Sequence, residues 1–211
     1  MIEYHKIETV YERSEGTKKL IEGQFRNKTV EYLADNEWIF TEKIDGTNIS
    51  VVWDGHKVEF HGRTERADIP KHLLAKLEEL FGGETNEEMF EQTFGEKNVI
   101  LYGEGYGAKI QKDGALYRSD VSFILFDVYF PANGIWLERE NIENVANAFG
   151  IDVVPIVLKG TIKEAVEYVK AKPKSFIGTA NVEGVVGVPS VGMYDRQKNR
   201  VIVKVKVRDF V

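Results

Sequence analysis

Several short stretches of the chain alternate hydrophobic and polar residues, which is the pattern of half-buried β-strands. Residues 200–207 show it most clearly, because every second residue from Val201 to Val207 is a valine and Lys204 and Lys206 fall between them. These two lysines should therefore point the same way, roughly 7 Å apart along the strand. Further β-type stretches are expected at residues 38–44, 48–53, 57–61, 99–103, 122–130, 153–158 and 183–188.

Three other stretches repeat apolar residues at helical spacing, at residues 70–81, 140–149 and 162–172. The first begins with Pro70, which suits the first position of a helix. Asp-Gly or Asn-Gly pairs at 45–46, 54–55, 113–114 and 133–134 mark turns. Strands predominate and do not alternate strictly with helices. The sequence therefore predicts an α+β fold with largely antiparallel β-sheets flanked by helices.

Length and composition fit one globular domain over residues 1–211. The chain is 43% hydrophobic, and it shows no repeat, low-complexity tract or linker. It has no cysteine, which excludes disulfides and thiolate zinc sites. The N-terminus lacks the apolar core of a signal peptide, and no apolar run is long enough to span a bilayer. A soluble, cytoplasmic protein without a membrane partner is expected.

Charge is distributed unevenly along a chain whose net charge is -6. Acidic residues dominate residues 78–96, and this run is interpreted as a solvated face. Every charged residue in 196–208 is basic, so this segment could hold phosphates inside an acidic protein. Viewed alone, the lysines of the last strand also fit an edge strand that is protected against aggregation.

A lysine ends a β-type run in Glu42-Lys43-Ile44-Asp45-Gly46-Thr47-Asn48, directly before a tight turn. Lysine is a poor nucleophile while it is protonated, and burial or neighbouring cations favour its neutral amine. Lys204 and Lys206 could supply those cations and also neutralise a polyphosphate. Lys-x-Asp-Gly alone is a weak signal, because so short a string recurs by chance and also describes a surface lysine beside a turn.

Four further strings place charged groups next to strands or glycines. Glu104 lies in the glycine-rich Tyr-Gly-Glu-Gly-Tyr-Gly, where the backbone can approach a ligand closely. Phe126 and Asp127 lie within an apolar strand, and Glu183 begins another, in Glu-Gly-Val-Val. Arg63 follows a glycine after a short strand and offers a guanidinium for phosphate or ribose. Taken singly, each also fits ordinary core or turn structure.

The order of these motifs is more informative than any one of them. Lys-x-Asp-Gly, Gly-Arg, Gly-Glu, Phe-Asp, Glu-Gly-Val-Val and Lys-x-Lys follow one another across residues 43–206. This order resembles the covalent nucleotidyltransferase superfamily of DNA ligases, RNA ligases and mRNA-capping guanylyltransferases. Asn48 and the stretch 103–112 resemble the branch of RNA ligase 2 and the RNA-editing ligases. The RNA ligase 2 branch often has histidine at the position of Asp45, so Asp45 departs from that branch towards the DNA-ligase pattern.

The resemblance implies an adenylylation domain and an ATP-dependent RNA ligase that acts in RNA repair. Lys43 would attack the α-phosphorus of ATP, release pyrophosphate and carry AMP through a phosphoamide bond. The AMP would pass to an RNA 5′-phosphate, and a 3′-hydroxyl would displace it to seal the strand. RNA ends or a nicked duplex are the partners that this chemistry implies.

The resemblance also assigns further site residues. Lys204 and Lys206 would contact the α-phosphate, and Asn48 would lie near it. The other implied nucleotide contacts are Arg63 and Glu104 at the ribose and flanking phosphates, Phe126 stacked on adenine, and Glu42 and Ile44 beside the nucleophile. Glu183 and Asp127 would help to hold a hydrated Mg²⁺ or Mn²⁺.

One departure concerns the end of the chain at Val211, just after the last motif. Relatives usually carry a further C-terminal domain, and the expectation here is a single adenylylation domain without one. Such a chain would be a minimal ligase, would join ends poorly, or would need a protein partner. The alternatives are a DNA ligase or capping-type enzyme, and a nucleotide- or RNA-binding module without catalysis.

Overall fold

The computed structural model describes residues 3–64 and 67–210, and the chain forms two compact units. The central unit consists of Asp45–Val154 together with the N-terminal residues up to Tyr4. The terminal unit consists of His5–Ile44 and Pro155–Val211. Each unit joins segments that are distant in sequence, which explains why no composition shift marked a boundary. The single domain predicted over residues 1–211 stays a prediction.

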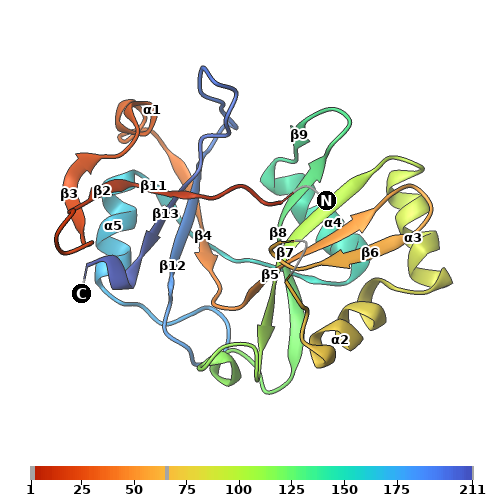
Figure 1. Ribbon diagram of the computed structural model, residues 1–211. Coiled ribbons are helices and arrows are strands. Elements are labelled where there is room, and N and C mark those ends of the chain that lie inside the picture. The colour runs from red at the N-terminus through yellow and green to blue at the C-terminus, as the bar shows by residue number, and fades with distance from the viewer. Residues whose placement is uncertain (1–2, 65–66, 211) are drawn as a thin grey trace. The chain divides into compact units, whose positions relative to one another are not determined.

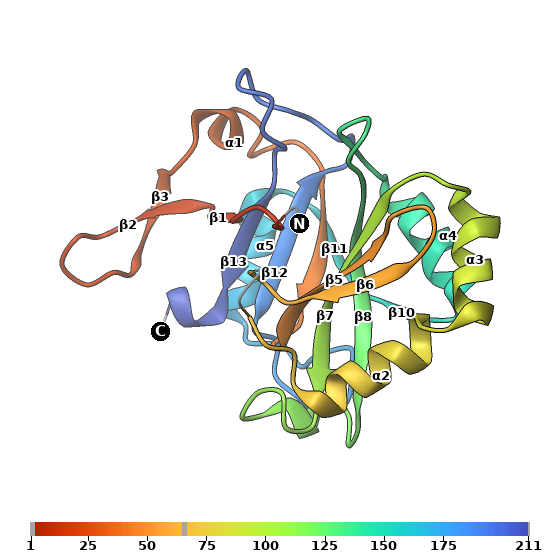
Figure 2. The ribbon, with the colours of Figure 1, turned by 45° about the vertical axis from the view of Figure 1, so that its right-hand side comes forward.

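A five-stranded sheet forms the terminal unit, in the order β1-β13-β12-β4-β11 (Figure 1). All neighbours are antiparallel except β1 and β13. Helix α5 lies against this sheet, and the β2–β3 ribbon extends away from it (Figure 2). The elements are β1 (Glu8–Thr9), β2 (Tyr11–Arg13), β3 (Leu20–Phe25), α1 (Lys28–Tyr32), β4 (Trp38–Lys43), β11 (Ile156–Gly160), α5 (Ile162–Lys170), β12 (Gly184–Pro189), β13 (Val203–Lys206) and the 3₁₀ turn η2 (Val207–Asp209).

The alternation of side chains between the two faces of each strand explains the core of the terminal unit. Trp38 and Phe40 on β4 and Val185, Val203 and Val205 on the neighbouring strands are buried on one face of the sheet. The apolar stripe of α5 covers them, and α5 begins with a capping box between Thr161 and Glu164. This helix ends before Lys172, whose φ of 49° is left-handed, so the predicted range 162–172 is two residues too long.

The central unit contains a six-stranded sheet in the order β10-β8-β7-β5-β6, with β9 paired to β8. Helices α2, α3 and α4 lie beside this sheet (Figure 1), and their side chains pack on one of its faces in a single core cluster. The elements are β5 (Thr47–Trp53), β6 (Val58–His61), α2 (Lys71–Phe81), α3 (Glu84–Phe94), β7 (Val99–Gly107), η1 (Gly114–Leu116), β8 (Val121–Phe130), β9 (Ile135–Trp136), α4 (Arg139–Phe149) and β10 (Asp152–Val153).

The predicted α+β class with largely antiparallel sheets is confirmed, whereas one predicted strand is wrong. Residues 153–158 do not form a single strand, because β10 pairs with β8 and β11 pairs with β4 in the other unit. Pro155 lies between them and has no amide hydrogen for a sheet ladder. Pro70 is the N-cap of α2 and not its first residue. None of the helices in the described ranges is long and apolar enough to cross a membrane.

Candidate functional site

Three lysines share one face of the terminal sheet. Gly184 of β12 is paired with Lys43 of β4 on one side and with Lys206 of β13 on the other. Because directly paired residues project to the same face, both lysines flank the same glycine. Lys204 lies two residues before Lys206 and shares that face. The predicted common direction of Lys204 and Lys206 is therefore confirmed.

The edge-strand interpretation of these lysines is wrong. Strand β13 is bordered by β1 and by β12, so it lies inside the sheet. The lysines thus stand on a sheet face and do not protect an open edge. Gly184 is required for this packing, since a Cβ atom there would lie 2.2 Å from the carbonyl oxygen of Val205.

Glu183 links two of the lysines. Lys43 Nζ donates to one carboxylate oxygen at 2.7 Å, and Lys206 Nζ donates to the other at 2.6 Å. Burial by itself would raise the pKa of Glu183, but the charges and hydrogen bonds of Lys43 and Lys206 outweigh it and lower that pKa. The carboxylate therefore stays ionised at neutral pH, and an entering phosphate would compete with it for both ammonium groups.

Lys204 adds a third cation that is half-buried. Its pKa is lowered, first by burial and then by the charges of Lys206 and Lys43. The three lysines on this face therefore repel one another, and the carboxylate of Glu183 lies between only two of them, Lys43 and Lys206. Such a face is stabilised by a polyanion, which is the electrostatic property that a triphosphate site needs.

Glu42 lies on the opposite face of β4 from Lys43, together with Val185 and Val205. Its side chain is almost completely buried and accepts hydrogen bonds from the hydroxyl of Ser175 and the backbone amide of Phe176. Ile44 is also buried. Whether Glu42 and Ile44 contact a nucleotide stays a prediction.

The remaining predicted residues belong to the central unit. Asn48 of β5 is directly paired with Glu104 of β7, so their side chains share the sheet face opposite the helical core. Arg63 is exposed in the segment after β6. The structure thus groups Lys43, Glu183, Lys204 and Lys206 in one unit, and Asn48, Arg63, Glu104, Phe126 and Asp127 in the other.

Phe126 and Asp127 lie at an irregularity of β8. The register with β7 shifts between Tyr102 and Gly103, which pair with Asp127 and Leu125, so Phe126 is the extra residue of a β-bulge. The hydroxyl of Tyr4 donates to buried Asp127 at 2.8 Å, and the Tyr4 ring meets Phe126 edge-on at 5.1 Å. Tyr4 contacts two predicted site residues, although sequence analysis gave it no role.

The turn after Lys43 is fixed within the central unit. The side-chain amide of Gln111 donates to the carbonyl oxygen of Gly46 at 2.8 Å. Gly46 cannot carry a side chain, because its Cβ atom would lie 2.3 Å from the carbonyl oxygen of Gly105. The stretch 103–112 contained Gln111, but only the tertiary contact reveals which residue it supports.

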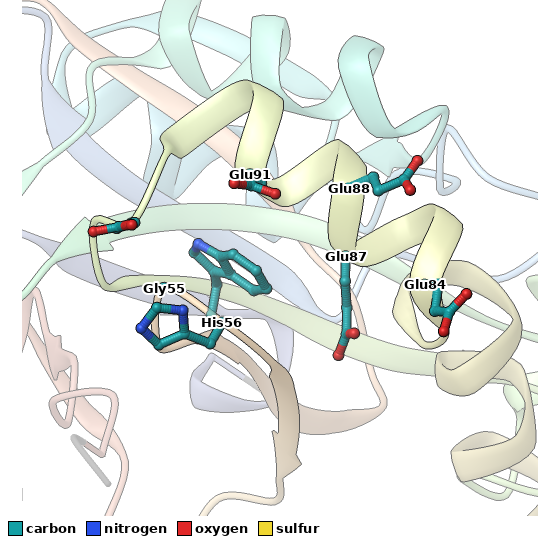
Figure 3. Close-up of a pocket in the computed structure, with 8 residues that line it drawn as sticks. Gly55, His56, Glu84, Glu87, Glu88 and Glu91 are labelled. Atoms are coloured by element: carbon teal, nitrogen blue, oxygen red, sulfur yellow. The ribbon is translucent and has the colours of Figure 1, made fainter.

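The acidic run 78–96 forms the solvated side of α2 and α3, as interpreted from the sequence. Part of it lines a pocket around His56 and Trp53, with carboxylates projecting from α3 (Figure 3). The acidic lining residues are Glu84, Glu87, Glu88, Glu91 and Glu96. So many carboxylates repel phosphate, which makes this pocket unsuitable for a nucleotide. Across residues 3–64 and 67–210, no three metal-ligating side chains cluster.

Comparison with solved structures defines the class of fold. A Naegleria gruberi RNA ligase variant with AMP and manganese gives a TM-score of 0.69 at 19% identity, covering 99% of this chain and 57% of that one. An apo variant gives 0.67 at 20%, covering 97% and 55%. The same ligase with pyrophosphate gives 0.65 at 20%, covering 87% and 53%. The fold is that of an RNA ligase adenylation domain, and the chain spans little more than half of those proteins.

The sequence places the chain within a family. The RNA ligase family profile matches residues 36–206, and the chain belongs to that family. The expected membership of the covalent nucleotidyltransferases is thereby confirmed. No curated protein sequence matches the chain.

Proposed function

We propose that this chain is an ATP-dependent RNA ligase that works through a lysyl-AMP intermediate on Lys43. The observation that carries the proposal is the lysine face, where Lys43 and Lys206 flank Gly184 and share Glu183, and Lys204 lies on the same face. Family membership supports it. So do the Naegleria gruberi RNA ligase structures, which were solved with ATP and manganese, with AMP and manganese, and with pyrophosphate.

The first step follows from this geometry. Lys43 Nζ gives up a proton to solvent and forms a bond to the α-phosphorus of ATP, and the bond from that phosphorus to pyrophosphate breaks, which releases pyrophosphate. Lys204 and Lys206 neutralise the phosphate oxygens, on which charge accumulates in the transition state. The ion pair with Glu183 holds Lys43 in place before ATP arrives, and phosphate takes over the contact with Lys206 when ATP enters.

Asn48, Arg63, Glu104 and Phe126 complete the proposed nucleotide site. Their roles are those that the family resemblance implies, with Phe126 on adenine and Glu104 and Arg63 at the ribose and flanking phosphates. Glu42 and Ile44 would act through the backbone of the nucleophile's segment, since the side chain of Glu42 is engaged elsewhere.

A hydrated Mg²⁺ or Mn²⁺ fits a site with few carboxylates, because Mg²⁺ keeps several of its waters when it binds protein. Glu183 and Asp127 are the carboxylates that we assign to this role, as the family resemblance implies. The ion supplies charge neutralisation at the phosphates. Glu183 would then exchange a lysine contact for the hydrated ion.

Incubation with ATP labelled at the α-phosphate and Mg²⁺, followed by a denaturing gel, tests the covalent step. A labelled band at the mass of the protein is expected, and hydroxylamine at acidic pH should release the label, as for a phosphoamide. A second candidate, a DNA ligase, is favoured only by Asp45. If the protein fails to label at every pH and metal concentration tried, neither ligase proposal survives.

A further inference from the structure

A short hairpin over residues 173–182 leads into the lysine site. Lys174 and Asn181 form a β-bridge, and Ser175 N and Val182 N donate to Ala180 and Pro173. Gly178, with a φ of 62°, turns the tip. The hairpin follows α5 and is followed directly by Glu183 and β12 (Figure 1).

A buried carboxylate fastens this hairpin to the strand that carries the nucleophile. One oxygen of Glu42 accepts from the hydroxyl of Ser175, and the other accepts from the amide of Phe176 at 2.9 Å. Ser175 Oγ also accepts from the amide of Ile177 at 2.9 Å. Burying a carboxylate is costly unless it is hydrogen-bonded, so these bonds hold the hairpin tip against the residue next to Lys43.

The side chain of Phe176, whose backbone amide is bound by Glu42, is exposed to solvent. Phe176 is 65% exposed, although its backbone is fixed. Residues 171–182 contain two lysines, Lys172 and Lys174, both exposed, and no acidic residue. An exposed aromatic ring on a fixed backbone, with exposed lysines in the same short segment, suits binding of single-stranded nucleic acid through base stacking and phosphate contacts.

We propose that Phe176 is a stacking platform for an unpaired RNA base near the end to be sealed, and that Lys172 and Lys174 contact the adjoining phosphates. The proposal rests on the proposed ligase function for its ligand. It gives the hairpin a task distinct from nucleotide binding, and it makes Glu42 and Ser175 positioning residues for RNA.

Binding of a 5′-phosphorylated single-stranded RNA, followed by fluorescence anisotropy, tests the platform. Phe176→Ala should weaken binding by about 10-fold, in the range for losing one stacked base, and Phe176→Trp should restore it. Tyr32→Ala is the matched control, because Tyr32 is 86% exposed but lies on α1 beside Glu31. Tyr32→Ala should bind RNA as the unmodified protein does, and all three variants should label with ATP normally.

An RNA with a single abasic nucleotide, moved along the strand, separates stacking from general damage. At one position the missing base should cost the unmodified protein about 10-fold in affinity and cost Phe176→Ala less than about twofold. Equal losses in both proteins at every position would overturn the proposal. So would unchanged RNA affinity in Phe176→Ala, including the case in which this variant alters only self-association in gel filtration.

The two proposals fail in different ways. If the unmodified protein does not label but Phe176→Ala still loses RNA affinity, the ligase proposal falls and the platform stands. If labelling is normal and Phe176→Ala binds RNA as tightly as the unmodified protein, the platform alone is wrong.

Discussion

Lys43 is held by a single ion pair with Glu183, and its amino group lies on the same sheet face as the other two lysines. We predict that Lys43 is the adenylylation site and that Lys43→Arg lowers labelling by at least about 10³-fold, because a guanidinium stays protonated and cannot attack phosphorus. Peptide mapping of the AMP adduct checks this. An adduct on Lys109 or Lys204 would contradict the assignment.

Glu183 should make stability depend on pH. Burial would raise its pKa, but Lys43 and Lys206 outweigh burial and place the folded-state pKa below the ordinary value of 4.5. A carboxylate whose pKa is lowered by folding stabilises the folded state. The stabilisation is complete at pH values above about 4.5 and is lost as the pH falls through the pKa of the folded state. Glu183→Gln should therefore be less stable at neutral pH, by roughly 1 to 3 kcal/mol.

Thermal unfolding from about pH 7 down to about pH 3 gives the measurement. The difference between Glu183→Gln and the unmodified protein should shrink below the ordinary carboxyl pKa, while exposed Glu88→Gln should show no such trend. If the difference stays constant across this range, the ion pairs do not stabilise the fold.

At the scale of elements, β13 combines a structural and a chemical face. Val203 and Val205 are buried in the core, and Lys204 and Lys206 project from the other side. We predict that Lys204→Ala and Lys206→Ala each reduce labelling by roughly 10² to 10³-fold, as loss of a transition-state contact does. Circular dichroism should show an intact fold, and exposed Lys198→Ala should label normally. Normal labelling by both strand variants would show that these lysines have no part in the chemistry.

Strand β12 sets the spacing of the two lysine-bearing strands. A Cβ atom at Gly184 would press on the carbonyl oxygen of Val205, a backbone atom that cannot move without shifting β13. Gly184→Ala should therefore destabilise the protein by roughly 2 to 4 kcal/mol and abolish labelling. Gly16→Ala is the control, because nothing lies near a Cβ atom there. An unchanged melting temperature for Gly184→Ala would mean that β12 and β13 can move apart enough to accommodate the methyl group without loss of stability.

At the scale of the whole molecule, the prediction concerns the sugar of the strand that is sealed. We predict faster sealing when the 3′-hydroxyl strand is RNA, motivated by Asn48 and the stretch 103–112. A site that binds the 2′-hydroxyl as donor and acceptor loses this hydrogen-bond partner on DNA. The loss costs at most about 3 kcal/mol. Asp45 leans towards the DNA-ligase pattern, so the preference is expected to be partial.

Nicked duplexes that differ only in the sugar of the 3′-hydroxyl strand make the comparison direct. Equal or faster sealing on the deoxy strand would reassign the chain to the DNA ligases. Failure on both, with normal labelling of Lys43, would place the defect in nucleic-acid engagement and leave the first chemical step intact.

The sequence pattern predicts a helix or strand most accurately where one face of the element carries only apolar residues. The valines of β13 and the apolar stripe of α5 identify their elements, because each presents one continuous buried face. The apolar pattern does not indicate helix α3, because its buried residues Phe90 and Phe94 stand among many carboxylates. The pattern also predicts one strand where β10 and β11 are separate, because Val153 and Ile156 are both apolar although they join different sheets.

By itself the sequence determined the family and the shared direction of Lys204 and Lys206, since motif order and strand periodicity are properties of the chain. Only the tertiary structure decided that Glu183 joins Lys43 to Lys206 and that Glu42 turns away to hold Phe176. Glu183 lies 140 positions from Lys43 and 23 from Lys206. They meet because β12 pairs with β4 and β13 at Gly184, and long-range pairing of this kind is set by the packing of the whole sheet.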